Sequence, residues 1–128
     1  MVTDADDACP KPGASGQGET ADTATRIRKL NDRFRRRLPG GKVVMTRRVA
    51  DLDPARIAAL LDRVRNFDAF TSDNDPHGEH DFGAFEDGGE RFFWKIDYYD
   101  KAMQFASPDP TNPDVTLRVL TLMPAEDY

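Results

Sequence analysis

Residues Asp73–Tyr99 read DNDPHGEHDFGAFEDGGERFFWKIDYY, and they contain both histidines and the only tryptophan of the 128-residue chain. The second half of this stretch predicts a β-hairpin, because two strand-like runs flank the turn signal Asp87-Gly88-Gly89. We expect strands at 81–86 and 91–99, in which alternate side chains face opposite sides of a sheet. The apolar set on the second strand is predicted to be buried, and it comprises Phe92, Trp94, Ile96 and Tyr98.

Two helices and one strand are predicted ahead of the hairpin. Apolar residues recur every three or four positions over 22–38, which predicts a helix that ends before the breaker Pro39-Gly40. Asp53 and Pro54 are typical of a helix start, and they predict a second helix over 54–65. The short β-branched run at 42–49 lies between the helices and predicts a strand.

The last part of the chain fits two secondary structures. A short strand is expected at 103–106, but the apolar positions between Val115 and Met123 match both a strand and a helix. Because Asn112-Pro113-Asp114 is typical of a helix start, a helix is expected there. The predicted class is α+β, with a small antiparallel sheet of about four strands packed against two to three helices.

The composition predicts a tail followed by one domain. Residues 1–21 contain almost no aliphatic side chains, which predicts a disordered tail and leaves a single domain over 22–128. Cys9 is the only cysteine, so the chain has no internal disulfide and no cysteine-rich zinc site. No apolar run is long enough to cross a membrane, and the acidic N-terminus is not typical of a secretory signal. We therefore expect a cytoplasmic protein without a membrane partner.

The net charge of -5 is unevenly distributed. Residues 22–48 contain ten basic and two acidic side chains, whereas residues 66–128 contain four basic and fourteen acidic ones. This division indicates a nucleic-acid face, a face for another partner, or two halves that neutralise each other. The nucleic-acid alternative rests on the basic side chains of the first predicted helix, which are Arg26, Arg28, Lys29, Arg33, Arg35, Arg36 and Arg37.

The loop before the hairpin concentrates side chains that can ligate a metal or transfer a proton. It does not match a calcium loop, because Ala84 stands where the bidentate glutamate belongs, and it lacks the helix of a zincin motif. Our leading hypothesis is a non-enzymatic, cofactor-free domain that binds a protein partner through this loop and the hairpin. The expected surface comprises Asp73, Asn74, Asp75, His77, Glu79, His80, Asp81, Lys95, Asp97, Tyr98 and Asp100.

A metal-dependent hydrolase is the alternative for the same loop. His77 and His80 would hold one divalent transition metal, with Asp75 as the third ligand or with Glu79, Asp97 or Asp100 in its place, and leave open positions for water. The metal-bound water would then be the nucleophile. The sequence does not determine the oligomeric state.

Four sequence motifs of the chain are similar to those of a known protein family. They are NDPHGEHDFGAF, WKIDYYD, SPDP and TLRVLTLM, in this order. With them the chain resembles, over about residues 30–128, a family of small uncharacterised alphaproteobacterial proteins. That family is a domain of unknown function often encoded on plasmids and other mobile elements. The resemblance implies no activity, but it implies a family signature formed by Asn74, Asp75, Glu79, His80, Asp81, Trp94, Asp97, Tyr98 and Asp100.

Overall fold

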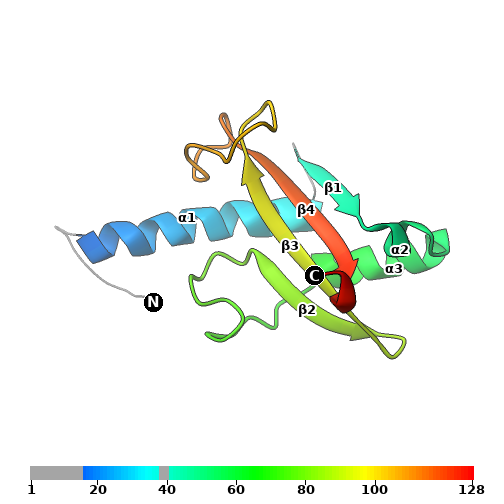
Figure 1. Cartoon of the computed structure of the whole chain (residues 1–128). Helices are drawn as coiled ribbons and strands as arrows, with labels where there is room; N and C mark the ends of the chain where they lie inside the picture. Colours follow the sequence, from blue (N-terminus) through cyan, green and yellow to red (C-terminus); the bar gives the residue numbers. More distant parts are fainter. Residues whose placement is uncertain (1–15, 38–40) are drawn as a thin grey trace.

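The computed structural model describes residues 16–37 and 41–128, with side chains from Asp22 onward. It contains one four-stranded sheet and three α-helices, which confirms the predicted α+β class (Figure 1). Cys9 and most of the predicted tail lie outside the described residues, and the division into tail and domain stays a prediction. The elements are α1 (Gly16–Arg37), β1 (Lys42–Met45), α2 (Arg47–Ala50), α3 (Pro54–Arg65), β2 (Phe82–Asp87), β3 (Glu90–Tyr99), β4 (Leu117–Pro124) and the 3₁₀ turn η1 (Ala125–Asp127).

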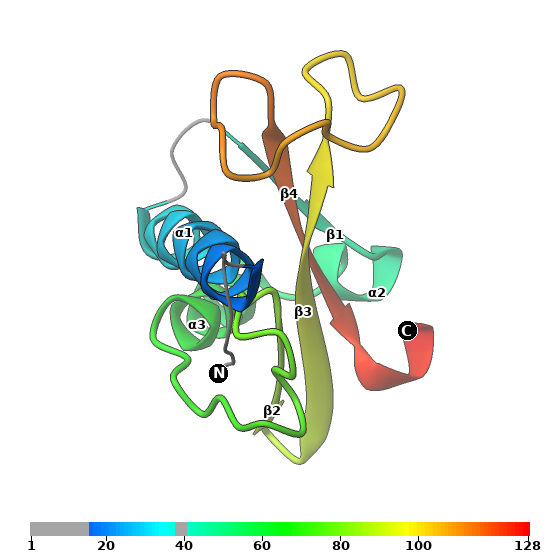
Figure 2. The ribbon, with the colours of Figure 1, turned by 90° about the vertical axis from the view of Figure 1, so that its left-hand side faces the viewer.

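The strands are arranged in the order β1-β4-β3-β2. The β2–β3 and β3–β4 pairs are antiparallel, but β1 runs parallel to β4, so the sheet is mixed. Both long helices, α1 and α3, lie on one face of the sheet (Figure 2). The short helix α2 connects β1 to α3 and lies at one end of the sheet.

The hairpin forms as the sequence predicts. Gly88 and Gly89 alone connect β2 to β3, and their φ angles are 62° and 81°. A two-residue hairpin loop with positive φ at both positions matches the right-handed twist of its strands, and glycine adopts it without strain. The turn therefore sets the register in which Phe85 pairs with Phe92.

The core lies between the sheet and the two long helices. Phe92, Trp94 and Ile96 of β3 point into it, as the alternation predicts, and each is at most 3% exposed. Leu60 and Val64 of α3 pack against this row, and Phe34 of α1 joins the same cluster. The helix predicted over 54–65 is confirmed with both of its bounds, and Pro54 occupies its first turn.

The strand predicted over 42–49 is too long. The ladder with β4 ends near Thr46, whose N–H donates to the carbonyl of Leu122, and residues from Arg47 form α2. The helical turn brings Val49 into the core, where it is fully buried. Tertiary burial of this one side chain outweighs the β propensity of the run.

The helix predicted near the C-terminus is wrong, because Leu117–Pro124 forms strand β4. β4 lies between β1 and β3, so both of its edges are hydrogen-bonded. Val119 and Met123 on one side of the strand and Leu120 and Leu122 on the other are buried, so its apolar residues form an almost continuous run. Such a run loses the alternation that marks a half-buried strand. Asn112 forms a turn instead of a helix cap, and its side-chain oxygen accepts from the N–H of Asp114 at 2.9 Å.

The short strand expected at 103–106 is reduced to one bridge between Tyr99 and Ala106. Asp100 organises the loop, because its carboxylate accepts from the N–H groups of Gln104 and Phe105. Of the helices that the structure describes, none has both the length and the apolar character needed to cross a membrane.

Candidate functional site

The acidic loop at 71–81 is fastened to α1 and β3 by side-chain contacts. Asn74 closes its first turn: the side-chain oxygen accepts from the N–H of Thr71 and the amide donates to the carbonyl of Ala69. Asp75 is buried, and its carboxylate accepts from the N–H of His80 at 3.1 Å. These two residues of the predicted surface therefore stabilise the loop itself.

His80 is held on three sides. Its Nδ1 lies 2.9 Å from Oδ1 of Asp32 on α1, and its Nε2 lies 3.5 Å from Oδ2 of Asp75. The ring stacks on Phe70, with 3.7 Å between ring centroids and an angle of 4° between the planes. The φ angle of 55° is unusual for a residue other than glycine, and the surrounding contacts hold it there.

Asn31 of α1 is the centre of a second group of contacts. It is fully buried, and its amide donates to the carbonyl of Glu79 and to the hydroxyl of Tyr98. Its oxygen accepts from Nε of Arg118 at 2.8 Å. The Tyr98 hydroxyl in turn donates to Oε1 of Glu79 at 3.2 Å. We call Asn31, Glu79, Tyr98 and Arg118 the polar cluster.

Arg35 fixes the other side of the same helix. Its guanidinium donates to the carbonyls of Val64, Arg65 and Phe67 and pairs with Asp32 at 3.0 Å. It is only 1% exposed, so this arginine of the predicted nucleic-acid set is a structural residue that joins α1 to the end of α3.

Burial changes the ionisation of the buried polar groups. It raises the pKa of the carboxyl groups of Glu79 and Asp81, because a less hydrated carboxylate is less stable. It raises the pKa of the Tyr98 hydroxyl for the same reason. It lowers the pKa of the guanidinium groups of Arg35 and Arg118. These groups lie in a region of weak hydration, where charge interactions are strong.

The remaining residues of the predicted surface do not converge. Lys95 and Asp97 form a 2.9 Å ion pair on the opposite face of β3 from Tyr98, in an open groove of about 650 Å³. Asp73 and His77 are exposed at the outside of the loop. Among the described residues, no three histidine, cysteine, aspartate or glutamate side chains are placed to hold a metal ion.

The basic side chains of α1 divide into two groups. Arg26 pairs with Asp22, Arg28 donates to the carbonyl of Gly78, and Arg35 is buried. The other four are exposed and form no ion pair with any residue that the structure describes. They follow one face of the helix, opposite to Asn31 and Phe34. We call this group the basic stripe, and it comprises Lys29, Arg33, Arg36 and Arg37.

A cavity of about 270 Å³ lies beside the basic stripe. Arg33 belongs to both the stripe and the cavity wall, and Arg118 and Lys101 add two further cationic side chains. Sequence reasoning missed Asn31 and Arg118, because a single polar residue in an apolar stripe does not show what it contacts. The only signal at Asn31 was polar character on the apolar face of the predicted helix, and Arg118 had no signal of its own.

The structure therefore defines a small α+β domain in which a polar cluster joins the first helix to the sheet. The sequence profile of a protein family of unknown function, DUF3768, matches residues 45–127. This match covers more than half of the chain, so the chain belongs to the DUF3768 family, which confirms the resemblance to a domain of unknown function. Searches of curated proteins and of solved structures found no match.

Proposed function

We propose that this domain binds the phosphate backbone of double-stranded nucleic acid through the basic stripe. The observation that supports the proposal is the free state of its four cationic side chains, which form no ion pair with the described residues. Charged side chains that contact phosphates release counterions from the duplex, and this release drives sequence-independent binding. The proposal makes the domain a non-enzymatic binding module.

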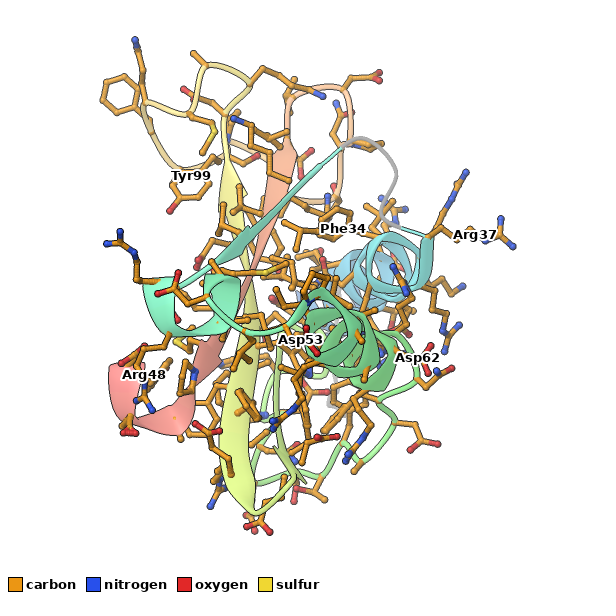
Figure 3. All side chains as sticks on the ribbon, turned by 90° about the vertical axis from the view of Figure 1, so that its right-hand side faces the viewer. Phe34, Arg37, Arg48, Asp53, Asp62 and Tyr99 are labelled. Atoms are coloured by element: carbon orange, nitrogen blue, oxygen red, sulfur yellow. The ribbon has the colours of Figure 1, made fainter. Side chains whose placement is uncertain are left out.

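The arrangement of α1 suits such a contact. Residues Lys29–Arg37 span about 12 Å along the helix axis at a rise of roughly 1.5 Å per residue. Figure 3 shows Phe34 on the side of α1 that faces the sheet and Arg37 on the side that faces away. Because Phe34 and Arg35 anchor the helix to the core, the stripe is presented from a rigid support.

The acidic loop supports a protein-binding role less well. Asp75, Glu79 and His80 already contact α1, β3 or the loop itself, so they contribute little free charge to an outer surface. Both ring nitrogens of His80 face carboxylates, and His77 is exposed on the outside of the loop. These positions also argue against the hypothesis of a metal-dependent hydrolase. A cytoplasmic location and an origin on a mobile element would suit a nucleic-acid-binding protein, and both stay hypotheses.

The test is the salt dependence of binding to a duplex, measured by fluorescence anisotropy with the full chain. Each neutralised phosphate contributes about -0.9 to the slope of log K against log salt, so four contacts predict a slope of roughly -3.6. We expect Arg33→Ala and Arg36→Ala each to reduce this slope by about 0.9.

Arg47→Ala is the matched control, because Arg47 is an exposed arginine on α2, away from α1, with a weak pair to Asp51 at 3.9 Å. It is expected to leave the slope unchanged. Absence of duplex binding at low salt, or an equal loss for Arg36→Ala and Arg47→Ala, would rule out the proposal.

A further inference from the structure

We infer that the cavity beside the basic stripe is a binding site for a phosphate monoester, and that its source is the terminal phosphate of a nucleic-acid strand. The naming of this source rests on the proposed function. The cavity is bounded by α1, by the loop that contains Lys101 and Pro113, and by the first residues of β4. Its volume of about 270 Å³ is just below the range of roughly 300–1,000 Å³ usual for small-molecule pockets.

Arg118 is the first observation that points to an anion. Its side chain is buried, at 6% exposure, yet no carboxylate of the described residues lies within ion-pair distance of it. Nε donates to Asn31 and Nη2 donates to the carbonyl of Pro110 at 2.6 Å. Within the described part of the chain, Nη1 has no hydrogen-bond partner, and it is not fully enclosed, so a ligand can reach it. A guanidinium that is largely removed from water and has no carboxylate partner favours an anionic ligand.

The surroundings of Arg118 keep its guanidinium in place. The carbon of the guanidinium lies 5.2 Å from the centroid of the Tyr98 ring, and Asn31 fixes the plane of the group from the other side. Glu79 is the nearest source of negative charge in the polar cluster, but it contacts the Tyr98 hydroxyl rather than the arginine. The guanidinium is therefore preorganised, and part of its positive charge remains available to a ligand.

Two more cations face the same cavity. Arg33 and Lys101 are exposed, and neither forms an ion pair with the residues that the structure describes. Leu30, Phe34 and Pro113 supply apolar walls, which reduce hydration and strengthen contacts between charges. Two arginines and a lysine suit the dianionic, three-oxygen group of a phosphate monoester better than a single carboxylate.

Arg33 connects the cavity to the basic stripe. Arg33 belongs both to the basic stripe and to the cavity wall. A nucleic-acid strand bound along the stripe can therefore place its terminal phosphate in the cavity. An internal phosphodiester carries one negative charge and is blocked on two oxygens, whereas a terminal phosphate offers three free oxygens and a second charge. The cavity therefore distinguishes the end of a strand from its interior, and we expect a duplex with a terminal phosphate to bind more tightly.

The experiment compares two duplexes of one sequence, one with terminal phosphates and one with terminal hydroxyl groups, in fluorescence anisotropy with the full chain. We expect the phosphorylated duplex to bind roughly tenfold more tightly, as for one added charge-assisted hydrogen bond. Lys101→Ala is expected to remove this difference and, because Lys101 is exposed in a loop, to leave the core intact. Arg36→Ala should weaken both duplexes equally, and Arg47→Ala should weaken neither.

A second measurement separates this inference from the proposed function. Inorganic phosphate and a nucleoside monophosphate are titrated into labelled protein, and the amide signals of Lys101, Thr116 and Arg118 are followed by NMR, with chloride as the control. Shifts at these amides without duplex binding would refute the proposed function and assign the site to a free phosphate monoester. The opposite result is duplex binding that depends on the basic stripe, has equal affinity for the two duplexes and occurs without phosphate-induced shifts. It would overturn the phosphate site in the cavity and leave the proposed function intact.

Discussion

Gly83 of β2 lies directly under the indole ring of Trp94 on β3, its partner in the sheet register. A methyl group at this position would overlap the indole nitrogen and the adjoining ring carbon. Trp94 is fully buried among core side chains and cannot move away. The absence of a side chain at Gly83 is therefore what allows the tryptophan to occupy the centre of the core.

Gly83→Ala is expected to lower the free energy of unfolding by about 1–3 kcal/mol, the usual effect of overpacking a core. Urea unfolding followed by tryptophan fluorescence measures the change. Gly89→Ala is a useful comparison, because a methyl group there meets no atom within 4 Å and only its φ of 81° is unfavourable. A Gly83→Ala protein as stable as the parent would contradict the close packing of the indole ring.

Glu79 gives the domain a predictable response to pH. Burial raises the pKa of its carboxyl group in the folded state, so the folded protein binds a proton more readily than the unfolded chain does. The stabilising contribution of this proton is complete below the ordinary pKa of a glutamate, about 4.3, and is lost as the pH rises through the raised pKa.

Glu79→Gln is therefore expected to gain stability relative to the parent at about pH 7 and to lose that advantage toward about pH 4.3. Glutamine keeps an oxygen that accepts from the Tyr98 hydroxyl, so the hydrogen bond is retained. Chemical unfolding at several pH values measures the difference, with the exposed Glu86→Gln as the control. A difference between Glu79→Gln and the parent that does not vary with pH would show that the carboxyl group is not desolvated.

At the scale of elements, Asn31 determines how α1 sits on the sheet. One side chain joins α1 to the acidic loop, to β3 and to β4. These partners are 48, 67 and 87 residues away in the chain. The periodicity of one helix contains no information on contacts with residues so distant in sequence. The helix prediction therefore did not indicate which polar residues of α1 would be buried.

Asn31→Leu is expected to destabilise the fold by roughly 2–4 kcal/mol, because it leaves a carbonyl and a buried arginine without their partners. Hydrogen exchange should increase most in the loop at 71–81 and in the second half of α1, which contains Asn31. Asn66→Leu is the control, since Asn66 is exposed and makes one bond to the carbonyl of Asp62. Equal effects of the two substitutions would contradict the central role of Asn31.

For the whole molecule, metal removal is the simplest test of the hydrolase alternative. In the described part of the chain no three suitable side chains converge, and the two carboxylates beside His80 already face its ring nitrogens. We expect Tm to be the same with and without EDTA, and His80→Ala to lower Tm in both conditions. A Tm that falls on adding EDTA in the parent but not in His80→Ala would restore the metal site.

Much of the whole fold followed from the sequence, because its signals are local. The Gly-Gly turn determined the hairpin, alternation identified Phe92, Trp94 and Ile96 as core residues, and Asp53-Pro54 located the start of α3. The C-terminal strand was mistaken for a helix because apolar residues are buried on both sides of β4, which removes the alternation typical of a half-buried strand. The candidate residues of the acidic loop were likewise named from their chemistry, which does not show whether they point outward or inward.

The sequence by itself determined the residues of the hairpin, of α3 and of most of α1, since turn chemistry and periodicity act within a few neighbouring positions. The start of α1 at Gly16 lies earlier than the predicted start at 22. Only the tertiary structure decided which charged groups are free. The stretch Asp73–Tyr99 proves to be a supported structural segment, because Asn31 and Asp32 of α1 bind it through the Glu79 carbonyl, the Tyr98 hydroxyl and the His80 ring. The free charge lies instead on the outer face of α1 and around Arg118, where packing left cations without carboxylate partners among the residues that the structure describes.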